Sequence, residues 1–232
     1  MQLFYQPDIQ TLKFLNEEES RHCTQVLRKQ SGDLLMITDG KGGLYECVIS
    51  NASKKKVAFR IIKETSPPKS NYILEIAIAP TKSMDRMEWF VEKCVELGVD
   101  RIVFIKCKHS ERKQINLGRL KKKAIAAMKQ SVKVRLPELT PLQSFNEAIT
   151  RAIDQKYIAF IDHDNPNLLI NTAEADSDTC VFIGPEGDFN KDEIEIAVQH
   201  GYQKISLGKS RLRTETAGIA ACHIIHLINE MN

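Results

Sequence analysis

The sequence predicts an α/β protein in which a small β domain precedes a larger domain built on a parallel sheet. Short apolar or alternating runs, separated by turn residues, fill the first 65 residues. From residue 72 onward, strands alternate with helices of ten residues or more. Two prolines in the polar stretch 65–71 separate the two patterns. We therefore expect domains at 1–68 and 72–232.

The first domain should contain strands at 34–38, 44–49 and 56–62. Turn residues lie between them at 32–33, 39–43 and 51–53, and one helix is expected over 18–27. Short strands at this spacing are typical of a small β-barrel.

The second domain should begin with a strand at 72–79 and an amphipathic helix at 84–97 that Gly98 ends. A strand at 101–107, a basic helix at 117–131 and a strand at 156–161 follow. The pattern predicts a parallel sheet covered by helices on both faces. No G-x-G-x-x-G follows the first strand, so a Rossmann-type nucleotide site has no support.

Two glycine-containing turns near the end of the chain are the strongest sign of a ligand site. A strand at 180–183 leads into Gly184-Pro185-Glu186-Gly187, and Asn190 with Glu193 predicts the cap of the next helix. A strand at 205–207 leads into Gly208 and a charged segment before a last helix at 214–229. Ligands bind beyond the carboxyl ends of strands in α/β sheets, so the two turns predict one pocket.

Composition and cysteine usage favour an ordinary globular protein. Hydrophobic residues make up 42% of the chain and charged residues 27%. The six cysteines show no C-x-x-C spacing and lie mostly in apolar segments, which predicts buried thiols in a reducing cytoplasm. No apolar run is long enough to span a membrane. We therefore expect a soluble cytoplasmic protein with neither a disulfide framework nor a zinc cluster.

Positive charge is concentrated in the middle of the chain. Residues 106–135 hold eleven lysines and arginines against one acid, Glu111. A lysine-rich helix face is often simply solvated, but this density favours a polyanionic partner such as nucleic acid.

Several short motifs together resemble one bacterial family. They are G-P-E-G at 184–187, L-G at 207–208, L-R-T-E-T-A at 212–217, D-R-M-E at 85–88, E-L-G-V at 96–99, S-E-R at 110–112, V-L-R at 26–28 and D-G-K-G-G at 39–43. This combination resembles the small-subunit ribosomal RNA uridine N3-methyltransferases of the SPOUT (trefoil-knot) superfamily. The resemblance spans nearly the whole chain.

The resemblance implies a trefoil-knot α/β domain, a PUA-like RNA-binding domain at 1–68 and a homodimer. It implies S-adenosylmethionine as cofactor, 16S ribosomal RNA or the 30S subunit as partner, and no metal. Cofactor contacts are expected from Ile183, Gly184, Pro185, Glu186, Gly187, Leu207, Gly208, Leu212, Arg213 and Thr214. RNA contacts are expected from Arg28, Lys41, Arg86, Lys108, Arg112, Lys121, Lys122, Lys123, Lys133 and Arg135.

The implied reaction requires removal of the uridine imide proton and stabilisation of the charge on O2 and O4. Arg213 is the first candidate for that stabilisation. Glu215 or Glu186 is expected to accept the proton or orient Arg213, although a glutamate at a helix start can equally serve the helix dipole. A related enzyme acting on a ribose hydroxyl or another rRNA position, and a non-catalytic RNA-binding protein, stay open as alternatives.

The chain departs from the family pattern at three positions. It has Asp188 in place of a second glycine, Ser210 in place of an arginine, and Lys129 in place of a glutamate. These differences bear on the loop conformation, on one RNA or cofactor contact and on an ion pair.

Other sites and the oligomeric state depend on weaker patterns. Cys222, His223 and His226 lie on an apolar helix, where packing is favoured over metal binding. The segment 162–166 reads as a turn rather than a catalytic group. The last helix is apolar nearly all round, which favours a homodimer.

Overall fold

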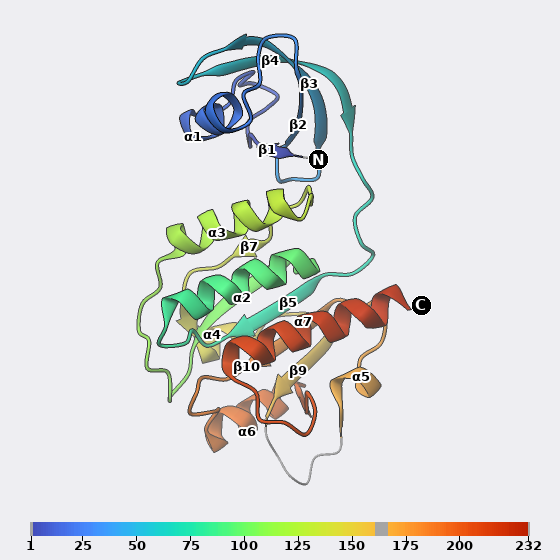
Figure 1. Ribbon diagram of the computed structural model, residues 1–232. Coiled ribbons are helices and arrows are strands. Elements are labelled where there is room, and N and C mark those ends of the chain that lie inside the picture. The colour runs from blue at the N-terminus through green and yellow to red at the C-terminus, as the bar shows by residue number, and fades with distance from the viewer. Residues whose placement is uncertain (1, 161–166, 232) are drawn as a thin grey trace. The chain divides into compact units, whose positions relative to one another are not determined.

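The computed structural model describes residues 2–160 and 167–231, and the chain forms two compact units (Figure 1). The first unit comprises Met1–Lys69 and Ile125–Leu136, and the second comprises Ser70–Ala124 and Pro137–Asn232. Residues 125–136 thus pack with the first unit, although they follow the expected boundary at 69–71.

The first unit contains a four-stranded sheet in the order β1-β2-β3-β4. The strands are β1 (Leu3–Tyr5), β2 (Leu34–Thr38), β3 (Leu44–Ala52) and β4 (Val57–Thr65). β1 runs parallel to β2, and the other two pairings are antiparallel. The three expected strands are present, β3 and β4 being longer than expected, and β1 was not predicted.

The helix expected at 18–27 lies at 17–26 and is irregular. An α-helix, α1 (Glu17–Arg21), is followed at once by a π-helical turn over His22–Val26. Asn16 caps α1, its side chain accepting a hydrogen bond from the Glu19 backbone N–H at 2.9 Å. Helical structure thus covers nearly the expected range, but it is divided into an α-helical and a π-helical segment.

The second unit contains a parallel sheet in the order β11-β9-β10-β5-β6-β7, with β8 also paired to β6. The strands are β5 (Leu74–Ile78), β6 (Arg101–Lys106), β7 (Glu138–Leu139), β8 (Gln143–Ser144), β9 (Gln155–Ala159), β10 (Thr179–Ile183) and β11 (Gln203–Ile205). Each pairing among these strands is parallel, as expected. β11 ends where the predicted strand at 205–207 was expected to begin.

The helices of the chain's remaining part are α2 (Met84–Leu97), α3 (Leu117–Gln130), α4 (Phe145–Ala148), α5 (Leu169–Thr172), α6 (Lys191–Gln199) and α7 (Thr214–Glu230). The bounds of α2 agree with the prediction, and Gly98 ends it in the left-handed conformation at φ 101°. Asn190 and Glu193 form the predicted capping box of α6. The short helices α4 and α5 were not predicted.

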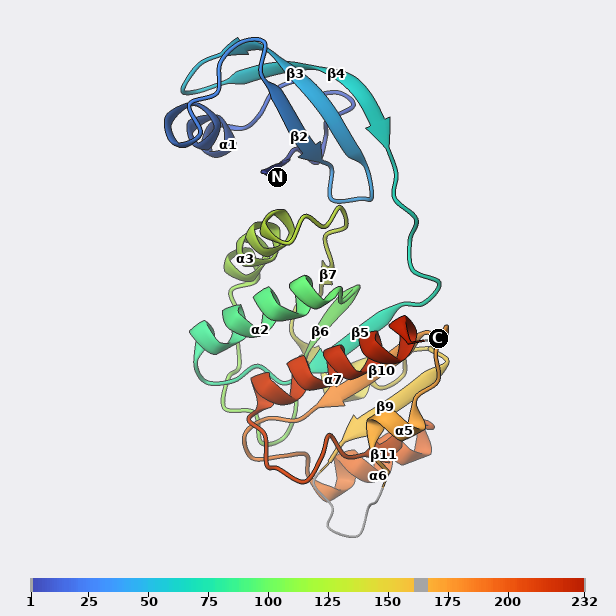
Figure 2. The same cartoon turned by 45° about the vertical axis from the view of Figure 1, so that its right-hand side comes forward.

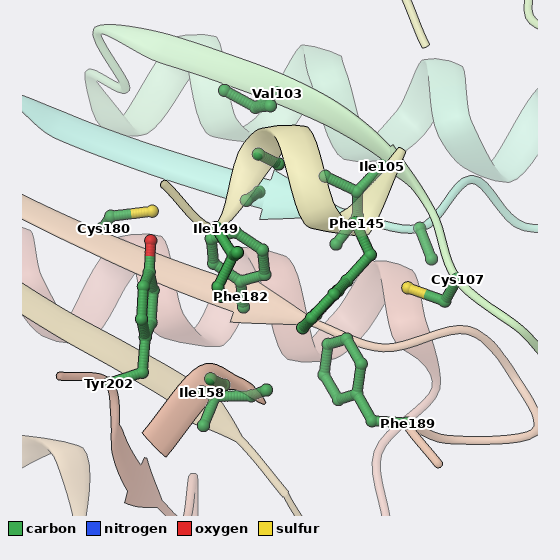
Figure 3. Packing of buried hydrophobic residues seen from close by; sticks show 14 residues of the cluster. Val103, Ile105, Cys107, Phe145, Ile149, Ile158, Cys180, Phe182, Phe189 and Tyr202 are labelled. Carbon is green, nitrogen blue, oxygen red and sulfur yellow. The ribbon is translucent and has the colours of Figure 1, made fainter. Parts of the chain in front are cut away.

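Helices cover both faces of the parallel sheet (Figures 1 and 2). α2 and α7 lie together on one face, so closely that a Cβ on Gly218 of α7 would stand 2.5 Å from the Phe90 ring of α2. On the other face, Phe182 of β10 packs edge-on against Phe145 of α4 and Tyr202, with ring centroids 5.7 and 4.8 Å apart (Figure 3). This three-layer arrangement fixes the strands whose carboxyl ends form the candidate site.

Candidate active site

A cavity of about 400 Å³ lies at the carboxyl ends of β9, β10 and β11 and at the start of α7. This volume is within the range of sites that enclose a small-molecule ligand. The cavity is lined by Arg86, Ala159, Phe160, Ile183, Gly184, Pro185, Glu186, Asp188, Ile205, Ser206, Leu207, Gly208, Ser210, Arg211, Leu212, Arg213, Thr214 and Ala217. The wall thus combines aliphatic surface from three strand ends with charged groups from two loops and from α2.

The turn after β10 forms one side of the cavity. A Cβ on Gly184 would stand 3.1 Å from the Phe189 ring, so a side chain there would press on a buried residue. The left-handed residue in this turn is Asp188, at φ 61°, rather than either glycine. Burial raises the pKa of the Asp188 carboxyl above its usual value. The departure from the family at Asp188 therefore retains a conformation that a glycine would adopt without strain.

The loop after β11 forms the opposite side. Gly208 has φ +124°, and no atom lies within 4 Å of the position its Cβ would take. The Ser206 hydroxyl accepts a hydrogen bond from the Gly208 N–H at 3.2 Å. The Thr214 hydroxyl donates to the Gly184 carbonyl at 3.0 Å, which ties this loop to the turn after β10. Both predicted turns therefore belong to one cavity wall.

Three arginines and two carboxylates supply the charge of the wall: Arg86, Arg211, Arg213, Glu186 and Asp188. Arg213 is exposed at the N-cap of α7. One oxygen of Glu186 accepts a hydrogen bond from the Lys82 backbone N–H at 3.0 Å, which anchors this exposed side chain to the loop before α2. The cavity can therefore present both a cation and a proton acceptor to a ligand.

Glu215 occupies a different position from the other expected catalytic residues. It is buried, with 4% of its surface exposed, and it is not part of the cavity wall. Its Oε1 lies 3.7 Å from Nε of Arg86, which does line the cavity. Glu215 therefore contacts a residue of the cavity wall without being part of that wall.

The expected cofactor residues line this cavity with one exception. Gly187 faces His109, whose Cβ would be 3.1 Å from a Cβ on the glycine. The ring Nδ1 of His109 also lies 3.1 Å from the carbonyl oxygens of Gly187 and Asp188. His109 was not predicted, because no motif links the strand at 101–107 to the later turn.

Several residues expected to contact RNA are engaged within their own unit. Arg112 donates to the carbonyls of Thr81 and Lys82. Lys123 pairs with Glu92 at 3.1 Å, and Lys108 lies 3.7 Å from Asp192. Arg135 donates to the Lys41 carbonyl at 2.8 Å, and the Lys41 ammonium donates to the Pro7 carbonyl at 3.1 Å. Arg28, Lys121 and Lys122 are exposed, Lys133 is half-buried, and Arg86 lies in the cavity wall.

The weaker candidates show no metal site. Among residues 2–160 and 167–231, no three His, Cys, Asp or Glu side chains are placed to hold a metal ion. Cys222 is buried, and His226 lies between the Tyr72 hydroxyl at 3.2 Å and Glu230 at 2.9 Å. The segment 162–166 lies outside the described residues. Within the described chain, no helix has the length and apolar character needed to cross a bilayer.

Lys129, the third departure from the family, pairs with Glu19 within the first unit. This contact lies in the unit that does not contain the cavity. The substitution therefore does not alter the cavity wall.

Comparison with known proteins identifies the family. The family profile described as RNA methyltransferase domain matches residues 68–226, and the profile described as RNA methyltransferase PUA domain matches residues 15–62. The chain belongs to this RNA methyltransferase family. The predicted fold class, an α/β domain with a parallel sheet preceded by a PUA domain, is thereby confirmed.

Individual relatives of this RNA methyltransferase agree over nearly its full length. A probable rRNA-methyltransferase from Porphyromonas gingivalis is 40% identical, with a TM-score of 0.95 over 100% of this chain and 99% of that one. A ribosomal RNA small subunit methyltransferase E from Neisseria gonorrhoeae, solved with bound S-adenosylmethionine, is 28% identical, with a TM-score of 0.87 over 99% and 98%. The enzyme of the same name from Rickettsia conorii is 25% identical over 94% of this chain and 90% of its own.

Proposed function

We propose that this protein transfers a methyl group from S-adenosylmethionine to N3 of a uridine in 16S ribosomal RNA. The observation that carries the proposal is the cavity at the ends of β9, β10 and β11, whose wall contains nine of the ten residues expected at the cofactor. The S-adenosylmethionine bound to the similar Neisseria gonorrhoeae structure supports the choice of cofactor. The names of the relatives support the small-subunit RNA as substrate.

The cavity wall fits such a cofactor. Leu207, Leu212 and Ile183 provide aliphatic surface for the adenine, and open space beside Gly208 lets a ligand approach the backbone. Gly184 and Thr214, joined by their hydrogen bond, fix the distance between the two loops. When bound, S-adenosylmethionine supplies an electrophilic methyl group, so the chemistry requires no metal.

The residues of the chain would orient the base and handle its proton. The new N3–methyl bond forms as the sulfur–methyl bond breaks, and the imide proton must leave N3. Glu186 lines the cavity and is held by the Lys82 N–H, so we propose it as the proton acceptor. Arg213 would stabilise the negative charge on the uridine oxygens. Glu215, which lies outside the wall, would act by positioning a neighbour.

RNA would be bound by both units. We propose that residues 1–68 form the RNA-binding domain, with Arg28 and Lys41 at phosphates. In the second domain, 72–232, the exposed residues Lys121 and Lys122 lie on α3, where they are available for phosphate contacts. Whether naked 16S RNA or an assembled 30S subunit is modified decides how many of these contacts form at once.

We further propose that the protein is a homodimer. α7 buries one stripe of residues against α2 and the sheet, while Ile219, Ile224 and Ile228 on other sides of the helix are only half-buried. On the neighbouring helix α2, Trp89 is 45% exposed. A second copy of the chain would cover this apolar surface. Light scattering that finds only a 26 kDa species at micromolar concentration would contradict this dimer.

Two further features follow the family resemblance. We propose a cytoplasmic location, because all six cysteines are free and buried, as in proteins of reducing compartments. The trefoil knot stays a prediction.

Mass spectrometry of the modified RNA tests the proposed reaction. 16S RNA or 30S subunits lacking the modification are incubated with the protein and S-adenosylmethionine. One portion is digested to nucleosides and compared with standards, and another is cut into RNA fragments to locate the added methyl group. The proposal predicts 3-methyluridine at a single position. Methylation of a ribose hydroxyl would favour the related-enzyme alternative, and binding of RNA without any methylation would favour a non-catalytic RNA-binding protein.

A further inference from the structure

Arg86 and Glu215 form a charged pair at the cavity that the motif-based roles do not explain. Arg86 lies in the first turn of α2, and Glu215 lies in the first turn of α7. Their side chains approach to 3.7 Å between Nε and Oε1. The two residues are 129 positions apart in sequence, so the packing of α2 on α7 brings them together.

The environments of the two partners differ. The Glu215 side chain is 6% exposed, whereas the Arg86 side chain is 43% exposed and lines the cavity. Burying a carboxylate is costly unless a cation or a hydrogen-bond donor compensates it. Glu215 therefore holds Arg86 from the buried side, while the exposed part of the guanidinium is available to a ligand.

The second oxygen of Glu215 shows that the pair is incomplete. Oε2 is buried and has no hydrogen-bond partner among the described residues. A guanidinium can bind a carboxylate with two parallel N–H groups, and the 3.7 Å separation at Oε1 is longer than such a contact. Oε2 is thus a second acceptor that Arg86 can use. If a ligand displaces water from the cavity and Arg86 binds both oxygens, this two-point contact would fix the plane of the guanidinium.

We propose that Arg86 is a second catalytic arginine, which stabilises negative charge on the substrate, and that Glu215 is its positioning residue. The inference rests on the proposed function. Loss of the imide proton spreads charge over two carbonyl oxygens, one on each side of N3, so two guanidinium groups could stabilise it better than Arg213 alone. Arg86 gives the cavity a second cation, which comes from α2 and is anchored by the Glu215 carboxylate.

This role has a consequence for cofactor binding. A guanidinium at the cavity wall repels the positive sulfonium of S-adenosylmethionine but not the neutral thioether of S-adenosylhomocysteine. Removing the charge of Arg86 should therefore raise the affinity for S-adenosylmethionine relative to S-adenosylhomocysteine, by about threefold. A residue that only supports the fold would change both affinities in the same proportion.

The test combines binding and turnover in the full-length protein. Arg86→Met removes the charge and keeps much of the aliphatic stem, and Arg86→Lys keeps the charge but loses the planar fork. Because Arg86→Met leaves Glu215 buried without its cation, the double variant Arg86→Met with Glu215→Gln serves as a second version of the test. Lys93→Met, on the same helix but outside the cavity wall, is the matched control.

We expect Arg86→Met and the double variant to lower kcat by about tenfold or more and to shift the affinity ratio as described. Arg86→Lys should retain the wild-type affinity ratio, and Lys93→Met should match wild type in each measurement. Glu215→Gln alone should lower kcat with little change in either cofactor affinity. In Arg86→Met the rate should keep rising with pH beyond the wild-type plateau, because without this cation the uridine imide is less acidic and loses its proton only at higher pH.

Two results would overturn the inference. One is an unchanged kcat in folded Arg86→Met; the other is a fall of both cofactor affinities in equal proportion to activity. Failure of the proposed function gives a different result, because the wild-type protein would then transfer no methyl group to small-subunit RNA.

Discussion

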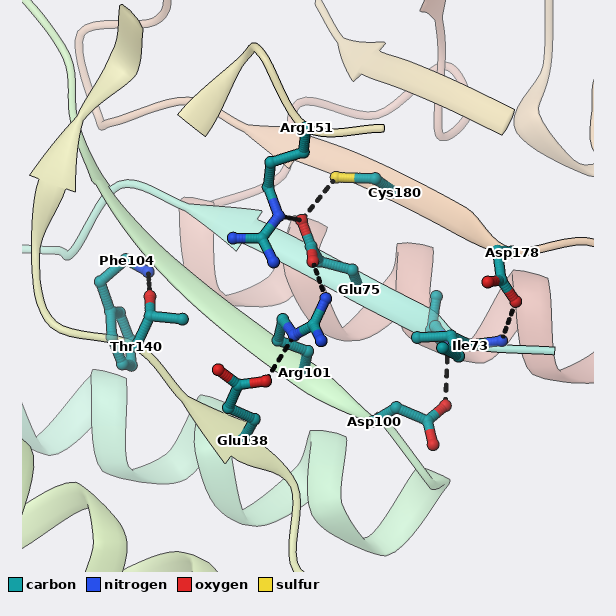
Figure 4. A network of polar contacts seen from close by, with 11 residues as sticks. Ile73, Glu75, Asp100, Arg101, Phe104, Glu138, Thr140, Arg151, Asp178 and Cys180 are labelled. Carbon is teal, nitrogen blue, oxygen red and sulfur yellow. Dashed lines mark hydrogen bonds and ion pairs between the residues drawn. The ribbon is translucent and has the colours of Figure 1, made fainter. Parts of the chain in front are cut away.

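Charged residues lie at both ends of the parallel sheet. At the amino end they pair with one another, whereas at the carboxyl end they face a cavity. At the amino end, Glu75 of β5 is fully buried and pairs with Arg101 and Arg151, each at 3.1 Å (Figure 4). The Cys180 thiol donates to the same carboxylate at 3.3 Å. At the carboxyl end, Arg86, Arg211 and Arg213 face a cavity, and one oxygen of buried Glu215 has no partner in the described part of the chain.

The difference separates a structural cluster from the proposed functional one. At the amino end, the buried Glu75 carboxylate is paired with two guanidinium groups and one thiol, so its charge is compensated within the protein. Burial and the neighbouring Glu75 carboxylate raise the pKa of the Cys180 thiol, which keeps it protonated as a donor. At the carboxyl end the charges are arranged around an open volume. Charge density alone therefore does not identify the site; unsatisfied charge beside a cavity does.

The largest effect is expected at Gly208. Gly208→Val should place a side chain in the open space beside the loop and reduce S-adenosylmethionine binding below detection in calorimetry. Gly201→Val is the matched control, because Gly201 also has a positive φ, +84°, and open space at its Cβ, but does not line the cavity. Both variants carry similar backbone strain. Equal loss of binding in the two variants would show that strain, and not cavity filling, is responsible.

At the amino end, Glu75→Gln should lower the free energy of unfolding by about 3 kcal/mol, because it leaves two arginines facing a neutral amide. Urea unfolding measures this change, and cofactor affinity should stay at the wild-type value. Glu138→Gln is the control, since Glu138 binds the same Arg101 at 2.7 Å but is 59% exposed. It should cost less than about 1 kcal/mol. A loss of cofactor affinity in Glu75→Gln would contradict the assignment of a purely structural role to the amino end of the sheet.

Arg213→Ala should lower the rate of methyl transfer about a hundredfold while leaving S-adenosylmethionine affinity nearly unchanged. The reason is that its interaction with the uridine oxygens is strongest in the transition state. Single-turnover kinetics and calorimetry on the same preparation separate the two quantities. If affinity falls in proportion to activity, Arg213 belongs to the cofactor site, and Arg86 or Arg211 carries the charge on the base.

The smallest effect is expected for the exposed lysines of α3, which belong neither to the Glu75 cluster nor to the cavity wall. Replacing Lys121 and Lys122 with Ala should make the plot of log binding constant against log salt concentration less steep. The slope should change by just under one for each phosphate contact that is lost. Lys123→Ala should leave the salt slope unchanged, because Lys123 already pairs with Glu92. Filter binding at several salt concentrations measures the slope. An unchanged slope in the double variant would make this helix face an ordinary solvated surface.

Local patterns predicted the elements of the second unit well. The 3.6-residue apolar period and Gly98 define α2, and the Asn190–Glu193 pair defines the start of α6. Short elements were missed, because β1, β7 and β8 depend on pairing with strands that are distant in sequence. The π-helical turn after α1 was missed because its sequence has the same apolar spacing as a regular helix.

The sequence predicted the turns that form the candidate site, but it did not predict how the charged side chains of the site pair. Both glycine turns are visible in sequence because strand ends, glycines and helix caps are local signals. By contrast, Arg86 was expected at RNA, and its contact with Glu215 depends on how α2 packs against α7. Glu75 was hidden for the same reason: one acid within an apolar strand gives no sign of the two arginines that reach it.

Hydrogen exchange with and without S-adenosylmethionine tests the contrast between the two ends most directly. Mass spectrometry of peptic fragments reads both ends of the sheet in one experiment. Cofactor binding should slow exchange in residues 183–188 and 206–214, which form the cavity wall. Exchange at the amino ends of β5, β6 and β10 should be unchanged. Protection that is absent from both loops, or that appears instead around Glu75 and Arg151, would contradict the assignment of the site.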